Sequence, residues 1–326
     1  MAARAGVTWR WSRFGLGVLY AVPAIAVAPF DPAVALALSI GVLPAAVVGL
    51  PARRRARSAI PVLGTLVALG LLLGATLALV PVLAVLAVAV LAVLASMLAA
   101  RERAGQLALT LVLPMVGIGL SFPLSTTTVL LAGAIVAGSV YAWLIALLWP
   151  EHEAGVRAAA SMPKGRALLM YGALLGLAAA TAAAIGFATG VEHVGWATGA
   201  VLLVMRPVRG QLVLRSVGRA ASVLVGALVA AGFALLSPSG AAIGLAIGIV
   251  VGCLGAVQES RWYVAPAFTT FLVLTLLLST SSEPPTARFL ERTLETLLGV
   301  ALALFFGALI PALLAIRRPT RANVSE

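Results

Sequence analysis

Four charged residues lie close together at the start of the last long apolar stretch of the chain: Arg288, Glu291, Arg292 and Glu295. Their spacings of three and four residues place them on one helical face, where Arg288 can pair with Glu291 and Arg292 with Glu295. Inside a membrane such charges face a partner or a wet path, because lipid solvates them poorly. We therefore predict that Arg292 attracts an anion and that Glu295 exchanges protons. The alternative is a solvated helix start, because 297–316 alone, at about 20 residues, is long enough to cross a bilayer.

A short apolar stretch, 194–205, contains Trp196 and is a second candidate site. At about 12 residues it is too short to cross a bilayer. Its counterpart in the first half of the chain contains Gly41 and Pro44. Paired short or interrupted helices are typical of transport sites near the middle of the membrane, because broken helices expose backbone groups.

Three further residues flank the same region of the chain. Arg206 and Arg209 follow the short stretch and could hold a carboxylate on the cytoplasmic side, and Tyr263 could stack on an aromatic substrate. The alternatives are interfacial anchoring for Trp196 and Tyr263, and a purely topological role for the arginines.

Residues for enzyme chemistry are scarce. The chain has 10 carboxylates, 2 histidines and 1 cysteine, without metal-ligand spacing or a paired acid and base. It also lacks a phosphate-binding glycine loop and a serine elbow motif. We therefore predict no catalytic residue, no metal and no cofactor, and a protein that is not an enzyme. A membrane enzyme acting on lipids is disfavoured for the same reasons.

The composition explains which elements must position these residues. Hydrophobic residues make up 62% of the 326 residues and charged residues only 10%, against roughly 25% charged in soluble domains. The formal charge of +12 comes from arginines in short clusters between apolar runs, which favours topology-setting and lipid headgroup contacts over nucleic-acid binding. The predicted environment is therefore a lipid bilayer.

The apolar runs predict an all-α polytopic protein with about twelve transmembrane helices. Lipid offers no partner for an unpaired backbone group, which favours helices for such long runs. Basic residues gather in alternate gaps between the runs, so both termini are predicted to lie on the cytoplasmic side. The predicted location is the cytoplasmic membrane. The predicted spans are 14–28, 33–50, 60–80, 82–99, 107–122, 129–148, 167–188, 194–205, 220–236, 241–256, 264–278 and 294–316.

The order of clusters and spans also indicates a duplication. The basic cluster 53–57 precedes a small-residue-rich span, as Arg215 and Arg219 do about 158 residues later. We predict two parallel six-helix repeats, because six spans per half give both halves the same orientation. The predicted divisions are 1–150 for the first repeat, 151–166 for a cytoplasmic linker, 167–316 for the second repeat and 317–326 for a cytoplasmic tail.

Glycines recur every four residues in two spans. Small residues at this spacing let membrane helices approach closely, so we assign them to helix packing. They are Gly240, Gly244, Gly248 and Gly252 in the tenth span, and Gly172 and Gly176 in the seventh.

Five segments of the second half carry a family resemblance. They are His-Val-Gly-Trp-Ala at 193–197, Leu-Val-Met-Arg-Pro at 203–207, Arg-Ser-Val-Gly-Arg at 215–219, Tyr-Val-Ala-Pro-Ala-Phe at 263–268 and Glu-Arg-Thr-Leu-Glu-Thr-Leu-Leu-Gly at 291–299. Their order resembles the fusaric acid resistance (FUSC) family, also called aromatic acid exporters. The resemblance implies export of small aromatic or hydrophobic carboxylic acids driven by the proton-motive force. Larger members carry sizeable cytoplasmic domains, for which this chain has only the linker 151–166.

Our interpretation is a proton-coupled exporter of small anionic aromatic or amphipathic molecules. The alternative from another class is a non-transporting membrane subunit that scaffolds an envelope-assembly complex. The sequence leaves homo-oligomerisation open.

Overall fold

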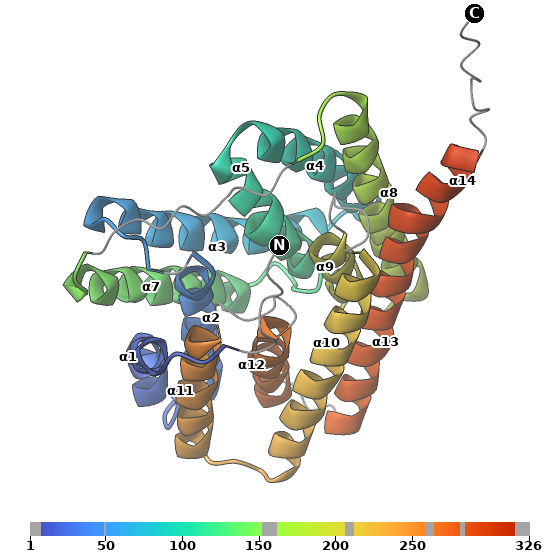
Figure 1. Cartoon of the computed structure of the whole chain (residues 1–326). Helices are drawn as coiled ribbons and strands as arrows, with labels where there is room; N and C mark the ends of the chain where they lie inside the picture. The colour runs from blue at the N-terminus through green and yellow to red at the C-terminus, as the bar shows by residue number, and fades with distance from the viewer. Residues whose placement is uncertain are drawn as a thin grey trace, which may run out of the picture.

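The computed structural model describes residues 8–48, 50–151, 162–205, 212–257, 264–280 and 284–316. All regular elements within these ranges are helices (Figure 1). The first half contains α1 (Trp11–Val27), α2 (Pro32–Val48), a 3-10 turn η1 (Arg54–Ser58), α3 (Ala59–Leu77), α4 (Pro81–Arg101), α5 (Arg103–Leu107), a π-helical turn η2 (Ala108–Val112), α6 (Leu113–Gly119) and α7 (Thr126–Leu148). The second half contains α8 (Arg166–Thr189), α9 (Gly195–Val204), α10 (Leu212–Leu235), α11 (Gly240–Ala256), α12 (Ala265–Thr280), α13 (Pro285–Leu304), a π-helical turn η3 (Phe305–Leu309) and α14 (Ile310–Ile316).

Twelve helical segments remain in the described ranges when η1–α3, α5–η2–α6 and α13–η3–α14 are each taken as one. Among the described residues, 6 of them are long and apolar enough to cross a membrane: η1–α3, α4, α7, α8, α10 and the run from α13 into α14. The other segments are apolar helices of 10–17 residues. Several helices of this length and hydropathy are the mark of a multi-pass membrane protein.

Two helices begin earlier than the apolar runs predicted. α10 begins at Leu212 instead of residue 220, and α13 begins at Pro285 instead of residue 294. Both predictions were wrong because they placed the span where charged residues end, although arginine, glutamate and leucine are good helix formers. Pro285 also suits the first turn of a helix. The charged residues of the two segments therefore lie within helices.

The outward surface of α4 is apolar along its length. Val82, Leu86, Val90 and Leu94 recur every four residues and are 72%, 59%, 57% and 55% exposed. A stripe of this kind would be unfavourable in water, whereas lipid tails match it. Contact with the lipid bilayer follows directly from this surface.

Each major contact in the first half has a counterpart in the second. α1 packs against α11, and α8 packs against α4, as Figure 1 shows. α2 packs against α7 as α9 packs against α13, and α3 packs against α6 as α10 packs against α12. At the centre, α2 contacts α12 and α6 contacts α9. Both halves therefore contribute helices to each side of the molecule.

The glycines of α11 face α1. A Cβ atom at Gly240 would meet the backbone at Ala28 and Pro29, and one at Gly252 would meet Phe14 and Val18. Gly244 and Gly248, between them, face Ile25. In α8, Gly172 faces Val93 and Ser96 of α4, and Gly176 faces the backbone of Ala89. All six glycines thus lie at two of the contacts that join one half of the chain to the other, α1 with α11 and α4 with α8.

The backbones of α1 and α11 also lie close together at Gly17, which the sequence did not single out. An alanine Cβ there would lie 2.5 Å from the carbonyl oxygen of Val251 and 2.9 Å from the Cα atom of Gly252. At Gly248 the nearest atom would be the flexible end of Ile25, at 2.9 Å. We therefore expect Gly17→Ala to destabilise the protein by about 1–3 kcal/mol, and Gly248→Ala by clearly less, because a backbone cannot rotate away.

Thermal unfolding of the purified variants in one detergent measures this difference. Equal melting temperatures for the two alanine variants would contradict the close backbone contact at Gly17.

Candidate functional site

A cavity of about 370 Å³ lies between the two halves of the chain. α2, α3, α6 and α7 line it from the first half, and α9, α10, α12 and α13 from the second. Thr110 and Leu111 of the π-helical turn η2 also line it, at a break of the regular helix that often accompanies functional sites. The volume falls in the usual range for small-molecule binding sites.

The two walls differ in charge. The first-half wall is largely apolar and includes Ala37, Ile40, Leu71, Met115, Leu131 and Ile135. The second-half wall includes Trp196, Arg215, Arg219 and Arg292. The cavity therefore combines an apolar side with a cationic side.

Arg219 of α10 and Arg292 of α13 form the buried part of the cationic wall. Each is only 7% exposed, and the Nε atom of each has no hydrogen-bond partner within the described residues. The Arg292 guanidinium lies 4.7 Å from the ring centroid of Trp196, in cation–π geometry. No ion pair within the described residues neutralises either arginine. Buried charges are costly without a partner, so the cavity is suited to an anion.

Glu295 does not pair with Arg292, contrary to the pairing expected from their spacing. Its side chain is buried at 6% exposure beside the backbone of Ala197 in α9, and it forms no ion pair with a described residue. It is not among the residues that line the cavity. The Arg292 guanidinium lies over the ring of Trp196 instead.

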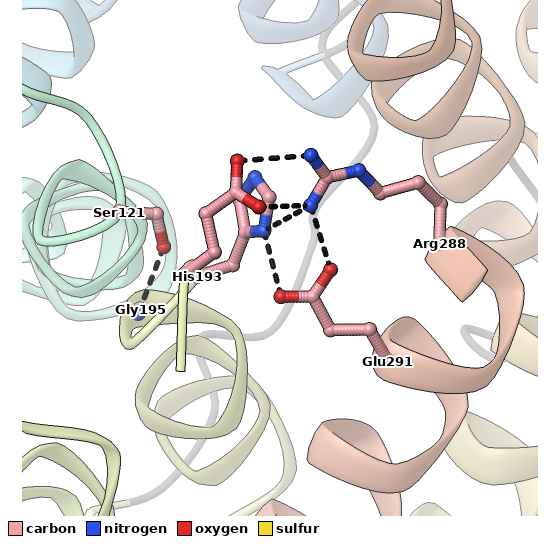
Figure 2. A network of polar contacts seen from close by, with 6 residues as sticks. Ser121, His193, Gly195, Arg288 and Glu291 are labelled. Carbon is pink, nitrogen blue, oxygen red and sulfur yellow. Dashed lines mark hydrogen bonds and ion pairs between the residues drawn. The ribbon is translucent and has the colours of Figure 1, made fainter. Parts of the chain in front are cut away.

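A network of ion pairs joins the start of α13 to the loop before α9 (Figure 2). Arg288 donates to both carboxylate oxygens of Glu192, at 2.7 and 2.9 Å, and to Glu291 at 2.9 Å. Glu291 also bonds His193 Nδ1 at 2.9 Å. Arg288 is 3% exposed, so the alternative of a solvated helix start is wrong for Arg288, Arg292 and Glu295. The loop that precedes α9 covers this face of α13.

His193 connects the network to the cavity. His193 lies in the loop before α9, yet it is only 4% exposed because it stacks on Trp196 with ring centroids 4.3 Å apart. Trp196 in turn contacts Arg292. The contacts therefore run without a break from exposed Glu192 through Arg288, Glu291, His193 and Trp196 to the cavity.

α9 is a short helix held inside the protein. Its ten residues rise only about 15 Å, half of the hydrocarbon thickness. The N–H of Gly195 donates to Ser121 Oγ at 2.8 Å (Figure 2), and the carbonyl of Met205 accepts from the Tyr171 hydroxyl at 3.2 Å. A broken helix at membrane depth is tolerated only where protein or a wet cavity satisfies its ends.

The ion pair with Arg288 makes the contribution of Glu192 to stability depend on pH. The hydrogen bond from Arg288 lowers the pKa of the Glu192 carboxyl below its ordinary value of 4.5, and the charge of Arg288 acts in the same direction. A group with a lowered pKa stabilises the fold above its unfolded value and loses that contribution as pH falls through the folded value. The contribution of Glu192 should therefore be fully present at pH 5–7, begin to fall below about pH 4.5, and be lost once the pH is below the lowered pKa of the folded state.

We expect Glu192→Gln to lower the melting temperature by on the order of 1 °C at pH 7, because exposed ion pairs are weak. The difference between the variant and the parent should shrink as the pH falls below about 4.5. Glu102→Gln, at an exposed position at the end of α4, is the matched control. A difference between Glu192→Gln and the parent that does not change with pH would rule out the ion pair as its cause.

The other predicted site residues have different outcomes. Trp196 and Arg292 line the cavity, and Arg288 and Glu291 lie in the ion-pair network. Arg206, Arg209 and Tyr263 lie outside the described residues. Arg215 and Arg219 were read only as part of a topology-setting cluster, yet both line the cavity. Their spacing of four residues on one helical face was the signal that could have singled them out.

The helices and the cavity define a multi-pass helical membrane protein with an internal, ligand-sized site. Residues 169–306 match the family described as fusaric acid resistance protein-like, and this confirms the family resemblance for that segment. No curated protein and no solved structure matches the chain. Trp196, Arg215, Arg219 and Arg292 all lie within the matched segment, and the family points to a membrane protein of transport or resistance.

Proposed function

We propose that this protein exports small aromatic or amphipathic carboxylic acids across the cytoplasmic membrane, and that it is a carrier and not an enzyme. The cavity carries the proposal: Arg219 and Arg292 face it without an anionic partner in the described residues, opposite an apolar wall. An aromatic carboxylate supplies both the negative charge and the apolar body that such a site lacks. Two guanidinium groups can share the two oxygens of one carboxylate.

The proposed architecture is twelve spans in two parallel six-helix repeats with both termini in the cytoplasm. The reciprocal contacts of α1 with α11 and α8 with α4 support the repeat. Contacts between loops support the sidedness. Arg288 meets Glu192, Ser121 meets Gly195, and Gly240 meets Pro29, all at gaps that the basic residues assign to the outside.

Proton coupling through Glu295 is part of the proposal. A carboxylate buried among helices without an ion pair to a described residue is the kind of group that carries protons in transporters. Arg292, which lines the cavity, lies one turn earlier on the same helix and interacts electrostatically with Glu295. The charge of a bound acid and the proton on Glu295 would then be coupled through Arg292.

Reconstituted protein in liposomes tests the proposal directly. We would measure the flux of labelled hydroxybenzoates and other aromatic acids with and without an imposed pH gradient. Saturable flux that requires the gradient, and that loses the gradient dependence in Glu295→Gln but not in the exposed control Glu102→Gln, is the expected result. Absence of flux from folded, inserted protein would favour the scaffold function.

A further inference from the structure

The cavity walls come from helices with matching contacts in the two halves. A Cβ atom at Gly299 of α13 would meet the carbonyl of Ala197 in α9, and one at Gly138 of α7 would meet the carbonyl of Leu38 in α2. The two glycines are 161 positions apart in the chain, and the two carbonyls 159. These sequence offsets relate positions on the α9–α13 wall to positions on the α2–α7 wall.

The same offsets pair the residues that line the cavity. Arg292 and Leu131 are 161 positions apart, Trp196 and Ala37 are 159 apart, and all four line the cavity. Leu131 therefore occupies on the first-half wall the place that Arg292 occupies on the other. The cavity has anion-binding groups at one of two related positions and a leucine at the other.

We infer that Leu131 determines which acids the site binds. Because it places an uncharged side chain at the position related to Arg292, it restricts the site to acids with a single anionic end. The inference rests on the proposed function and names the substrate more narrowly. The carboxylate lies at Arg292 and Arg219, and the apolar body lies against Leu131, Ile135 and Met115. A second carboxylate on the far end of the ligand would be stripped of water against this apolar wall without a partner, which is costly.

The test uses calorimetric binding to full-length protein in nanodiscs. The probes are 4-methylbenzoate, with one anionic end, and benzene-1,3- and benzene-1,4-dicarboxylate, with two. The unmodified protein should bind the monoacid at least tenfold more tightly than either diacid. Leu131→Arg should bind one of the diacids at least tenfold more tightly than the unmodified protein does. Leu131→Gln, which adds polarity without charge, should keep the original preference.

Leu131→Arg that binds the monoacid as before, without a gain for either diacid, would overturn the inference. If that variant does not fold, the reverse exchange decides: Arg292→Leu should lose at least tenfold in affinity for 4-methylbenzoate but bind neutral 4-methylbenzamide as the unmodified protein does. Retained affinity for 4-methylbenzoate in Arg292→Leu would overturn the inference. The experiment distinguishes failure of this inference from failure of the proposed function. Preferential binding without flux would contradict only the proposed export, and flux without the shift in preference would contradict only the role of Leu131.

Discussion

Replacing Arg292 by glutamine should weaken the binding of an aromatic carboxylate by on the order of 30- to 100-fold. Arg292 is buried, faces the cavity and has no ion pair with a described residue, so a bound carboxylate would be its main counter-charge. Removing one partner of a buried ion pair costs about 2–5 kcal/mol, and the lower end applies here because Arg219 remains. Calorimetric titration of 4-methylbenzoate measures the loss.

Two variants control this experiment. Arg292→Lys keeps the charge but loses the planar group that lies over Trp196, so its affinity should fall between those of the parent and of Arg292→Gln. Arg101→Gln removes an arginine at an exposed position and should bind as the parent does. Affinity that stays within twofold in Arg292→Gln would remove Arg292 from the binding site.

Arg57→Ala should be the most destabilising of the substitutions considered, by about 3 kcal/mol or more. Arg57 is fully buried and donates to the carbonyl groups of Ala146, Trp149, Pro150 and Pro51, so it ties the end of α7 to the start of α3. Its removal leaves several buried carbonyl groups unpaired. Each unpaired carbonyl costs roughly 1–3 kcal/mol, and the cost is smaller where water can reach it.

A drop in melting temperature of about 5 °C or more in detergent is the expected readout. Arg55→Ala, two residues away and exposed, should melt within about 1 °C of the parent, because surface substitutions are usually small in effect. Similar melting of the two variants would show that the bonds of Arg57 contribute little.

The helices were predictable because lipid leaves the backbone few alternatives. Long apolar runs such as the one in α4 have to be helical, and twelve runs predicted twelve segments. The errors fell at Leu212 and Pro285, where charged residues continue a helix beyond its apolar part. Hydropathy measures contact with lipid, and one face of each of these helix starts carries arginines that line the cavity.

The candidate site was predictable only in part. Trp196 and Arg292 were identified because an aromatic and a charge stand out against an apolar sequence. Arg219 was missed because arginines near a cytoplasmic gap usually set topology. Whether an arginine faces a cavity depends on which helices pack around it, and pairings such as α6 with α9 join residues far apart in the chain. No local pattern encodes them.

The crossed pairing of the halves has a consequence for synthesis. Gly17 in α1 packs against Val251 in α11, so α1 is synthesised 234 residues before the part of α11 that it packs against. At about 5–20 residues per second this delay is roughly 12–47 s, during which the close glycine face of α1 is open to lipid or to other proteins. The segment 169–306 could not bury these faces by itself, because its helices α8 and α11 pack on α4 and α1, which lie outside that segment. Each half depends on the other to bury its glycine-rich faces, and a truncated chain would offer those faces to whatever helix it meets first.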